Sequence, residues 1–196
     1  ILQYGTEEQK REFLPKIAEG KLIMTLAFTE PSGRFDEAGI ETRATQANND
    51  YIITGTKLFV PDAHVADWLL CVARTDKGTT LFLINNKSPG ISCTLLRTLA
   101  SDKQCEVILD KVKLPAKNIL GELGKGWEIM ERIKEWGSVA QCALISGCLQ
   151  QVLEMSVDYA KQRMQFDRPI GSFQAIHHKC ADMAMDVDGV RFITYE

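Results

Sequence analysis

The spacing of apolar residues divides this chain into a short helical stretch, a strand-rich stretch and a long helical stretch. Near the N-terminus, Phe13 and Ile17 lie four residues apart, on one face of a helix. Thr6 can cap that helix at its start, and Gly20 can end it. We therefore predict a helix from about residue 6 to residue 19.

A series of short strands follows this helix. β-Branched and aromatic residues recur with a period near two between turn signals such as Asn48-Asn49-Asp50 and Ser88-Pro89-Gly90. The predicted strands comprise residues 22–28, 41–47, 51–54, 57–60, 68–73, 79–84, 91–94 and 105–112. Short strands at this spacing are typical of a compact antiparallel β-barrel or sandwich.

The period changes to that of a helix near Gly124, and apolar residues keep helical spacing from residue 126 to about residue 166. Asp167-Arg168-Pro169 should interrupt this helix, because proline lacks an amide donor and restricts the residue before it. Ser172 is the predicted N-cap of a last helix. The order helix, all-β, helix predicts an α+β fold, with an antiparallel β-barrel or sandwich domain flanked by segments of helical bundle.

Composition narrows the classes of function. The 196 residues are 45% hydrophobic and 25% charged, as in ordinary globular proteins. The net charge of -3 and the lack of a long basic run give no reason to expect a nucleic-acid partner. No apolar stretch reaches the roughly 18–20 residues of a membrane span, so we expect none. The charged first residues do not resemble a signal peptide.

The cysteines leave two interpretations open. No CxxC pair exists, and most cysteines stand in apolar company. A metal site or a disulfide framework is one interpretation. Buried free thiols in a reducing cytoplasm are the interpretation that we favour. The six are Cys71, Cys93, Cys105, Cys142, Cys148 and Cys180.

Two motifs far apart in the sequence carry the chemistry. MTLAFTEPSGRFD occupies residues 24–36, and RMQFDRPIGSFQ occupies residues 163–174. In this order, with strands between them and helices on either side, they resemble the acyl-CoA dehydrogenase family. Those flavoenzymes have a helical domain, a central β-domain and a second helical domain.

This resemblance implies a domain organisation. Residues 1–21 would end the first helical domain, residues 22–122 would form the β-domain, and residues 123–196 would begin the second helical domain. The chain covers about half of such an enzyme. It begins without an initiator Met and stops inside a predicted helix, so we expect a fragment.

The first motif implies a flavin contact. Thr29 ends an apolar strand and, taken alone, can be a residue that closes the following turn. In the family, this Thr and backbone groups bind the pyrimidine edge of the flavin, which assigns Leu26, Phe28 and Thr29 to the cofactor. The family's next residues include a serine that contacts the thioester substrate. Phe35 holds that substrate-binding position here but has no hydroxyl, and Arg34 replaces a glycine.

A second segment, GTKLFVPD at residues 55–62, resembles the family's Gly-x-Lys-x-Trp-Ile-Thr-Asn. The family's Trp packs against the flavin and its Thr approaches the reactive nitrogen, which assigns Phe59 and Pro61 to the cofactor. Phe59 can supply an aromatic wall or can be a core residue of a strand. Pro61 has neither a hydroxyl nor an amide hydrogen to donate. Lys57 is interpreted as structural.

The spacing Arg-x-x-Phe, Pro-Ile, Phe-Gln in residues 163–174 is the most specific signal in the chain. In the family, this helix–turn–helix reaches the FAD of a neighbouring subunit. The resemblance implies that Arg163 meets the pyrophosphate, with Phe166 beside it, and that Phe173 and Gln174 lie along the adenosine end. A guanidinium stays charged and matches phosphate oxygens. Standing alone, Arg163 would be interpreted as a solvated helix residue.

No catalytic base is assigned. The family's glutamate usually lies in the last helical domain beyond residue 196, and a minority carries it where this chain has Gly137. Ser138 follows at a substrate-binding position that is often arginine in the family, and Glu135 points to another helix face. No metal site is predicted. His64 is a weak substrate-side candidate in a loop, and His177 and His178 are interpreted as ordinary helix residues.

Three hypotheses on function remain. The first is FAD-dependent dehydrogenation of an acyl-CoA by a cytoplasmic homo- or heterotetramer, with electron-transferring flavoprotein as the acceptor. The second is a non-catalytic structural subunit of such a complex, because four family positions are altered at Phe35, Pro61, Gly137 and Ser138. The third is a stand-alone β-barrel binding module.

Overall fold

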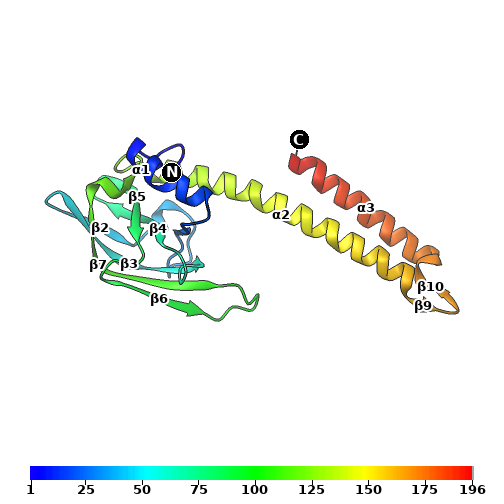
Figure 1. The fold of residues 1–196 in the computed structure, drawn as a ribbon. Coiled ribbons are helices and arrows are strands. Elements are labelled where there is room, and N and C mark those ends of the chain that lie inside the picture. The colour runs from blue at the N-terminus through cyan, green and yellow to red at the C-terminus, as the bar shows by residue number, and fades with distance from the viewer. Residues whose placement is uncertain (196) are drawn as a thin grey trace. The chain divides into compact units, whose positions relative to one another are not determined.

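The computed structural model describes residues 1–195. Within this range the chain forms two compact units, residues 1–131 and residues from 132 onward. The first unit is a sheet with the helix α1 (Glu7–Ala18), and the second is a helical hairpin (Figure 1). The mixed α+β class is therefore confirmed. The predicted domain limits at residues 21 and 122 stay predictions.

Helix α1 begins and ends where the sequence predicts. Thr6 accepts the amide hydrogen of Gln9, and the Gln9 side chain accepts the amide hydrogen of Thr6, which is a capping box. Gly20 follows the helix in a left-handed conformation. The Phe13 ring packs edge-on against the Trp68 ring of the sheet, with the ring centroids 5.0 Å apart. These contacts hold α1 on the sheet.

The first unit contains an eight-stranded sheet that is mainly antiparallel. Its order is β6-β7-β3-β2-β4-β5-β8, and β1 pairs with β4. The strands are β1 (Met24–Ala27), β2 (Arg43–Ala47), β3 (Asp50–Pro61), β4 (Trp68–Thr75), β5 (Gly78–Asn85), β6 (Ile91–Leu96), β7 (Gln104–Pro115) and β8 (Ile119–Leu120). Two short 3-10 helices, η1 (Glu37–Gly39) and η2 (Ala116–Asn118), join them.

This sheet differs from the prediction in three ways. The pairings of β1 and β2 with β4 are parallel, and no ladder among residues 1–195 joins β8 to β6, so no closed barrel forms. The predicted strands 51–54 and 57–60 are one continuous strand, β3. Gly55, between the two predicted strands, lies within β3. A Cβ there would lie 2.8 Å from Thr42 Cα, so the glycine allows close approach of backbone within the sheet.

The core lies on the inner face of this sheet and is aliphatic with two aromatic members. The rings of Tyr51 and Phe82 lie 5.3 Å apart at its centre. Alternate residues of β3 and β7 point into the core, whereas β5 is buried along almost its whole length. The buried face thus fixes the register of β3, because a shift of one residue would expose its apolar side.

The second unit is built on two helices and a tight hairpin. Helix α2 (Gly126–Gln162) starts in the first unit, and α3 (Gln174–Tyr195) turns back in the second (Figure 1). Between them lie β9 (Met164–Gln165), β10 (Arg168–Pro169) and η3 (Ile170–Ser172). The predicted end of the helix near residue 166 is therefore a few residues late.

The prediction that Ser172 caps the last helix is wrong. Its hydroxyl donates to the Pro169 carbonyl, 2.7 Å away, as part of η3. The last helix starts at Gln174, and the Phe173 carbonyl accepts the amide hydrogens of Ile176 and His177. The Ser172 hydroxyl instead stabilises a local turn that the sequence pattern did not predict.

The cysteine prediction holds only in part. All six thiols are free, but only Cys71 and Cys105 are buried. Cys93, Cys142 and Cys148 are exposed and Cys180 is half-buried, so burial is wrong for these four. Apolar neighbours in the sequence do not show that a cysteine is buried, because many apolar residues of the helices are themselves exposed. Within residues 1–195, no helix is both long enough and apolar enough to cross a bilayer.

Candidate functional site

The end of β1 and the end of β3 lie side by side, although they are about 30 residues apart in sequence. The Leu58 amide donates to the Thr29 carbonyl at 2.8 Å, and the Thr25 hydroxyl donates to the Pro61 carbonyl at 2.7 Å. Residues 26–29 and 57–60 are therefore neighbours in the fold. Leu26, Phe28 and Thr29 are half-buried there, so part of each remains open to a ligand.

A β-bulge turns Phe59 out of the sheet. Three steps along β3, from Lys57 to Val60, oppose only two steps along β7. Phe59 adopts a left-handed φ of 51° in this bulge, and 54% of its surface is exposed. The interpretation of Phe59 as a core aromatic is therefore wrong. A bulky residue in this conformation is strained, and such strain is typical of functional sites.

An ion pair lies beneath this edge, with both side chains buried. Lys57 is 0% exposed and Glu30 is 2% exposed, and Lys57 Nζ lies 2.5 Å from Glu30 Oε1. Lys57 also donates to the Phe28 carbonyl at 3.3 Å. The structural interpretation of Lys57 is consistent with these contacts, which tie residues 28–30 to β3.

The loop after Pro61 is also held in place. The Asn86 side-chain amide donates to the Ala63 and Ala66 carbonyls, at 2.7 and 2.9 Å. Pro61 itself is exposed at the end of β3.

Aromatic rings gather beside the end of β1. The Phe28 ring lies 6.3 Å from the Phe35 ring and 6.1 Å from the Trp127 ring. Phe35 is 64% exposed on a polar loop. Trp127 was missed by sequence reasoning, because its place in the first turn of α2 gives no signal that it approaches β1. Arg34 is paired with Asp36, and this contact lowers the pKa of the Asp36 carboxyl.

In the second unit, residues 163–174 form a compact turn with an exposed face. The Arg163 carbonyl accepts from the Ile170 amide at 2.8 Å, and the Arg163 side chain is exposed. Phe166 and Asp167 both have positive φ, of 54° and 62°, in the two-residue loop between β9 and β10. This is the pattern of a type I′ turn, which usually uses Asn and Gly. Gln174 is exposed at the start of α3.

The aromatic residues of this turn contact one another. The rings of Phe166 and Phe173 lie 6.0 Å apart, edge to face. The Arg168 guanidinium lies 4.0 Å above the Phe173 ring, a cation–π contact that the sequence did not predict. Phe166 is nevertheless 85% exposed. Of the residues predicted here, the structure thus brings Phe166 and Phe173 into contact, while Arg163 and Gln174 are exposed.

The positions predicted for the base and substrate do not form a charged site among the described residues. Gly137 and Ser138 are exposed on α2, and the Ser138 hydroxyl donates to the Lys134 carbonyl of its own helix. Glu135 is paired with Arg132 at 2.8 Å. We therefore assign no base here.

The described histidines and thiols do not cluster as metal ligands would. His64 Nδ1 lies 3.9 Å from Cys105 Sγ, and no cluster of three or more possible ligands occurs within residues 1–195. Partial desolvation and a hydrogen bond to Cys105 raise the pKa of the exposed Cys93 thiol above its usual value. Its thiol is therefore protonated and weakly nucleophilic near neutral pH.

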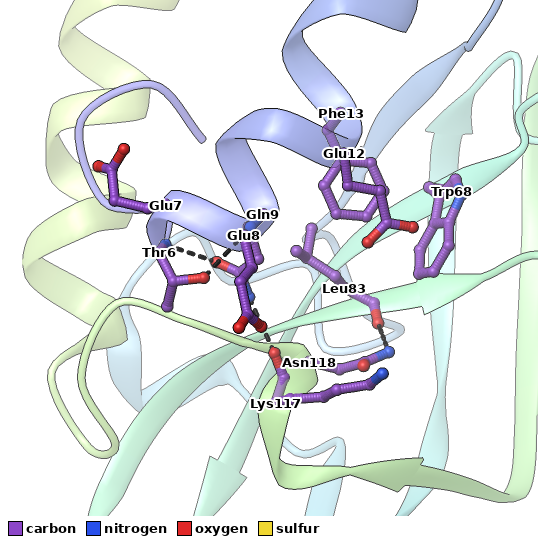
Figure 2. Close-up of a pocket in the computed structure, with 10 residues that line it drawn as sticks. All are labelled: Thr6, Glu7, Glu8, Gln9, Glu12, Phe13, Trp68, Leu83, Lys117 and Asn118. Atoms are coloured by element: carbon purple, nitrogen blue, oxygen red, sulfur yellow. Dashed lines mark hydrogen bonds between the residues drawn. The ribbon is translucent and has the colours of Figure 1, made fainter.

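Neither of two pockets in the structure contains a predicted flavin-ring contact. A pocket of about 520 Å³ lies between α1 and the sheet, lined by Glu7, Glu8 and Glu12 on one side and by Lys117 and Asn118 on the other (Figure 2). It contains none of the predicted site residues. A smaller apolar pocket of about 270 Å³ in the second unit includes residues of α2, η3 and α3. Neither pocket is the candidate site.

Two known family models match this chain. Residues 25–112 match the family model "Acyl-CoA dehydrogenase, middle domain", and residues 124–196 match "Acyl-CoA dehydrogenase, C-terminal domain". The two matched regions are the sheet and the long helices of this structure, in that order. The chain belongs to the acyl-CoA dehydrogenase family. The match over residues 124–196 removes the hypothesis of a stand-alone β-barrel module.

Individual relatives agree along the whole chain. The short-chain specific acyl-CoA dehydrogenase of Megasphaera elsdenii is 34% identical over 100% of this chain and 54% of its own length. A glutaryl-CoA dehydrogenase from Mycobacterium smegmatis, solved in complex with FADH2, is 30% identical with a TM-score of 0.90 over 99% of this chain and 51% of that one.

A chain in a structure entitled "Electron transferring flavoprotein of Acidaminococcus fermentans" is 31% identical, with a TM-score of 0.95 over 100% of this chain and 53% of that one. The present chain thus spans about half the length of the relatives that it matches.

Proposed function

We propose that the protein catalyses the FAD-dependent α,β-dehydrogenation of an acyl-CoA thioester. The observation that carries this proposal is the contact between residues 26–29 and the β3 bulge. This contact joins the half-buried Thr29 to Leu58, the residue before the exposed Phe59. Family membership supports the reaction class, and the FADH2 complex of the glutaryl-CoA dehydrogenase relative supports the cofactor.

The residues present fit a flavin. Phe59 would cover one face of the ring and exclude water, and Leu26, Phe28 and Thr29 would border its polar edge. In the second unit, the exposed Arg163 guanidinium suits a pyrophosphate, with Phe166, Phe173 and Gln174 beside it. When bound, FAD supplies the acceptor for the β-hydride.

Substrate binding would use the open side of the same edge. Phe35 stands next to Phe28 and would meet the acyl thioester through apolar contact, in place of the family's serine. Ser138 is the second proposed substrate contact. Removal of the α-proton needs a base that none of the described residues supplies, and the thioester carbonyl must be polarised as enolate charge develops.

Further parts of the proposal concern the assembly. We propose that electrons leave to an electron-transferring flavoprotein, consistent with the relative in the Acidaminococcus fermentans structure. We also propose a homo- or heterotetramer in the cytoplasm. The exposed apolar residues of α2 and α3 support association, and six free thiols suit a reducing compartment. Light scattering that shows only monomer at micromolar concentration would contradict the tetramer.

The experiment uses full-length protein, including any residues that precede Ile1 or follow Glu196. An acyl-CoA added under anaerobic conditions should bleach the flavin absorbance of the purified holoprotein, and an electron-transferring flavoprotein should restore it. Little restoration is expected with oxygen. If the protein retains FAD but no acyl-CoA of a broad panel bleaches it, dehydrogenation is refuted.

That negative result would favour a second candidate, a non-catalytic structural subunit of a heteromeric complex. Specific observations motivate this alternative. Pro61 offers no donor where the family has threonine, and the Ser138 hydroxyl is occupied by its own helix. Copurification with a catalytic paralogue would support it.

A further inference from the structure

The buried pair of Glu30 and Lys57 has no part in the proposed reaction, yet it lies directly beneath the proposed flavin edge. Neither side chain reaches solvent, since Lys57 is 0% exposed and Glu30 is 2% exposed. Burying two charges is costly, and an apolar pair of similar size often gives equal or greater stability. The pair therefore calls for an explanation other than general stability.

The pair joins three segments of the first unit. Glu30 accepts the amide hydrogen of Glu41 at 2.7 Å and that of Thr42 at 3.1 Å, both in the segment that leads into β2. Lys57 on β3 donates to Glu30 and to the Phe28 carbonyl, at 2.5 and 3.3 Å. Residues 28–30 are thus held between β2 and β3 by charge-assisted hydrogen bonds.

These contacts set the direction of two successive peptide groups. The Phe28 carbonyl points to Lys57, and the Thr29 carbonyl accepts from the Leu58 amide at 2.8 Å. In a planar trans peptide, the carbonyl and the following amide hydrogen point in opposite directions, and no cis peptide occurs among residues 1–195. The amide hydrogen of Thr29 therefore points away from the buried ammonium group.

We propose that Glu30 and Lys57 are positioning residues that aim the Thr29 amide, and with it the Thr29 side chain, at the polar edge of the flavin ring. The proposal rests on the proposed FAD-dependent function. The buried lysine fixes the Phe28–Thr29 peptide, and the carboxylate fixes the lysine. A donor held in this way stabilises negative charge on the ring without reorganisation.

The test compares full-length protein with two altered forms. Lys57→Met alone leaves a buried carboxylate, whereas Glu30→Gln with Lys57→Met removes both charges and keeps an amide oxygen that can accept from Glu41 and Thr42. Lys113→Met is the matched control, because the exposed Lys113 pairs with the half-buried Asp50 on the same sheet. Thermal unfolding, the FAD dissociation constant, the flavin absorbance spectrum and the flavin reduction potential are measured for each.

The double variant should fold and bind FAD about tenfold more weakly, the effect of one lost hydrogen bond in the site. Its flavin bands should shift, and its potential should become more negative, while Lys113→Met matches the wild type. A folded double variant with the wild-type dissociation constant, spectrum and potential would overturn the positioning role. Failure of both variants to fold would also overturn it, by showing that the pair serves the whole sheet. Wild-type protein without FAD would instead refute the proposed function itself.

Discussion

The two proposed parts of the cofactor site are built in opposite ways. In the first unit, residues 26–29 rest on a buried ion pair and on β3, so their backbone directions are fixed within the chain. In the second unit, the turn of residues 163–174 is ordered mainly by its own contacts, and Arg163 and Gln174 face solvent. The comparison indicates that the proposed ring edge is preorganised within the chain, whereas the proposed phosphate-binding residues Arg163 and Gln174 are exposed.

One feature is common to both parts. Phe59 and Phe166 are exposed aromatic residues with left-handed backbone, at φ of 51° and 54°. Each such residue lowers the stability of the folded state by roughly 1–2 kcal/mol, compared with a residue that suits the left-handed conformation. Backbone strain of this kind is typical of functional sites.

The largest expected effect is in the preorganised part. Lys57→Met should destabilise the protein by about 3–5 kcal/mol, because it leaves the Glu30 carboxylate buried without its partner. Urea unfolding of full-length protein measures this change. The exposed Lys113→Met should change stability by less than about 1 kcal/mol. Equal effects of the two substitutions would show that burial does not distinguish these pairs.

In the second unit, replacing Arg163 should remove a cofactor contact without unfolding the protein. Arg163→Ala should weaken FAD binding by roughly 1.5–3 kcal/mol if a phosphate contact is lost, with an unchanged unfolding temperature. FAD release from the holoprotein measures the affinity. Arg191→Ala, an exposed arginine of α3 outside the predicted segment, is the control. Unchanged FAD affinity in Arg163→Ala would exclude this arginine from the site.

A buried thiol in the first unit and an exposed thiol in the second unit should differ in their pH dependence and reactivity. Burial raises the pKa of Cys71 from 9.0 to about 11, so the folded state holds its proton longer than the unfolded state. The resulting stabilisation is complete below about pH 9 and is lost as the pH rises to about 11, a change of roughly 1–3 kcal/mol. Urea midpoints from pH 8 to pH 11 should therefore fall more steeply in the wild type than in Cys71→Ala.

The exposed Cys142 of the second unit gives the contrasting case. It should react with a thiol reagent in native protein at pH 8, while Cys71 should react only after unfolding. Parallel pH curves for wild type and Cys71→Ala would mean that the Cys71 thiol does not contribute to this pH dependence.

A smaller effect concerns backbone strain. Phe166→Asn should raise stability by about 1 kcal/mol, because Asn tolerates the left-handed conformation and the exposed ring contributes little burial. FAD affinity should fall in the same variant. A loss of stability would show that the contact between Phe166 and Phe173 outweighs the strain.

The smallest effect is expected at Pro61. Pro61→Thr restores a hydroxyl and an amide donor at an exposed position and should be tolerated. One hydrogen bond near the flavin is worth about 0.5–1.5 kcal/mol, so the rate of flavin reduction should change by roughly tenfold at most. Rapid-mixing spectroscopy measures this rate. A change of several hundredfold would mean that the proline reshapes the site.

Local patterns predicted much of the fold. The capping residues of α1, the strands of the sheet and the start of α2 follow from residue spacing, because those signals act within a few residues. The pairing of β1 with β4, the ion pair of Glu30 with Lys57 and the exposure of Cys142 and Cys148 depend on contacts across the chain. No single-sequence pattern carries that information.

The spacing of family motifs predicted the site, and the chemistry of single residues would not have identified it. The spacing of Arg163, Phe166 and Gln174 identified their segment, but neither the left-handed turn nor the stacking of Arg168 on Phe173 could be read from it. Likewise, the bulge that exposes Phe59 arises from the register between β3 and β7, which depends on both strands.

The visible absorbance spectrum of purified full-length protein shows whether this chain contributes to an FAD site. We expect a yellow protein with the two bands of oxidised flavin, and an FAD content that falls in Arg163→Ala and in the Glu30→Gln, Lys57→Met double variant. A folded, colourless protein that takes up no added FAD would rule out the FAD site.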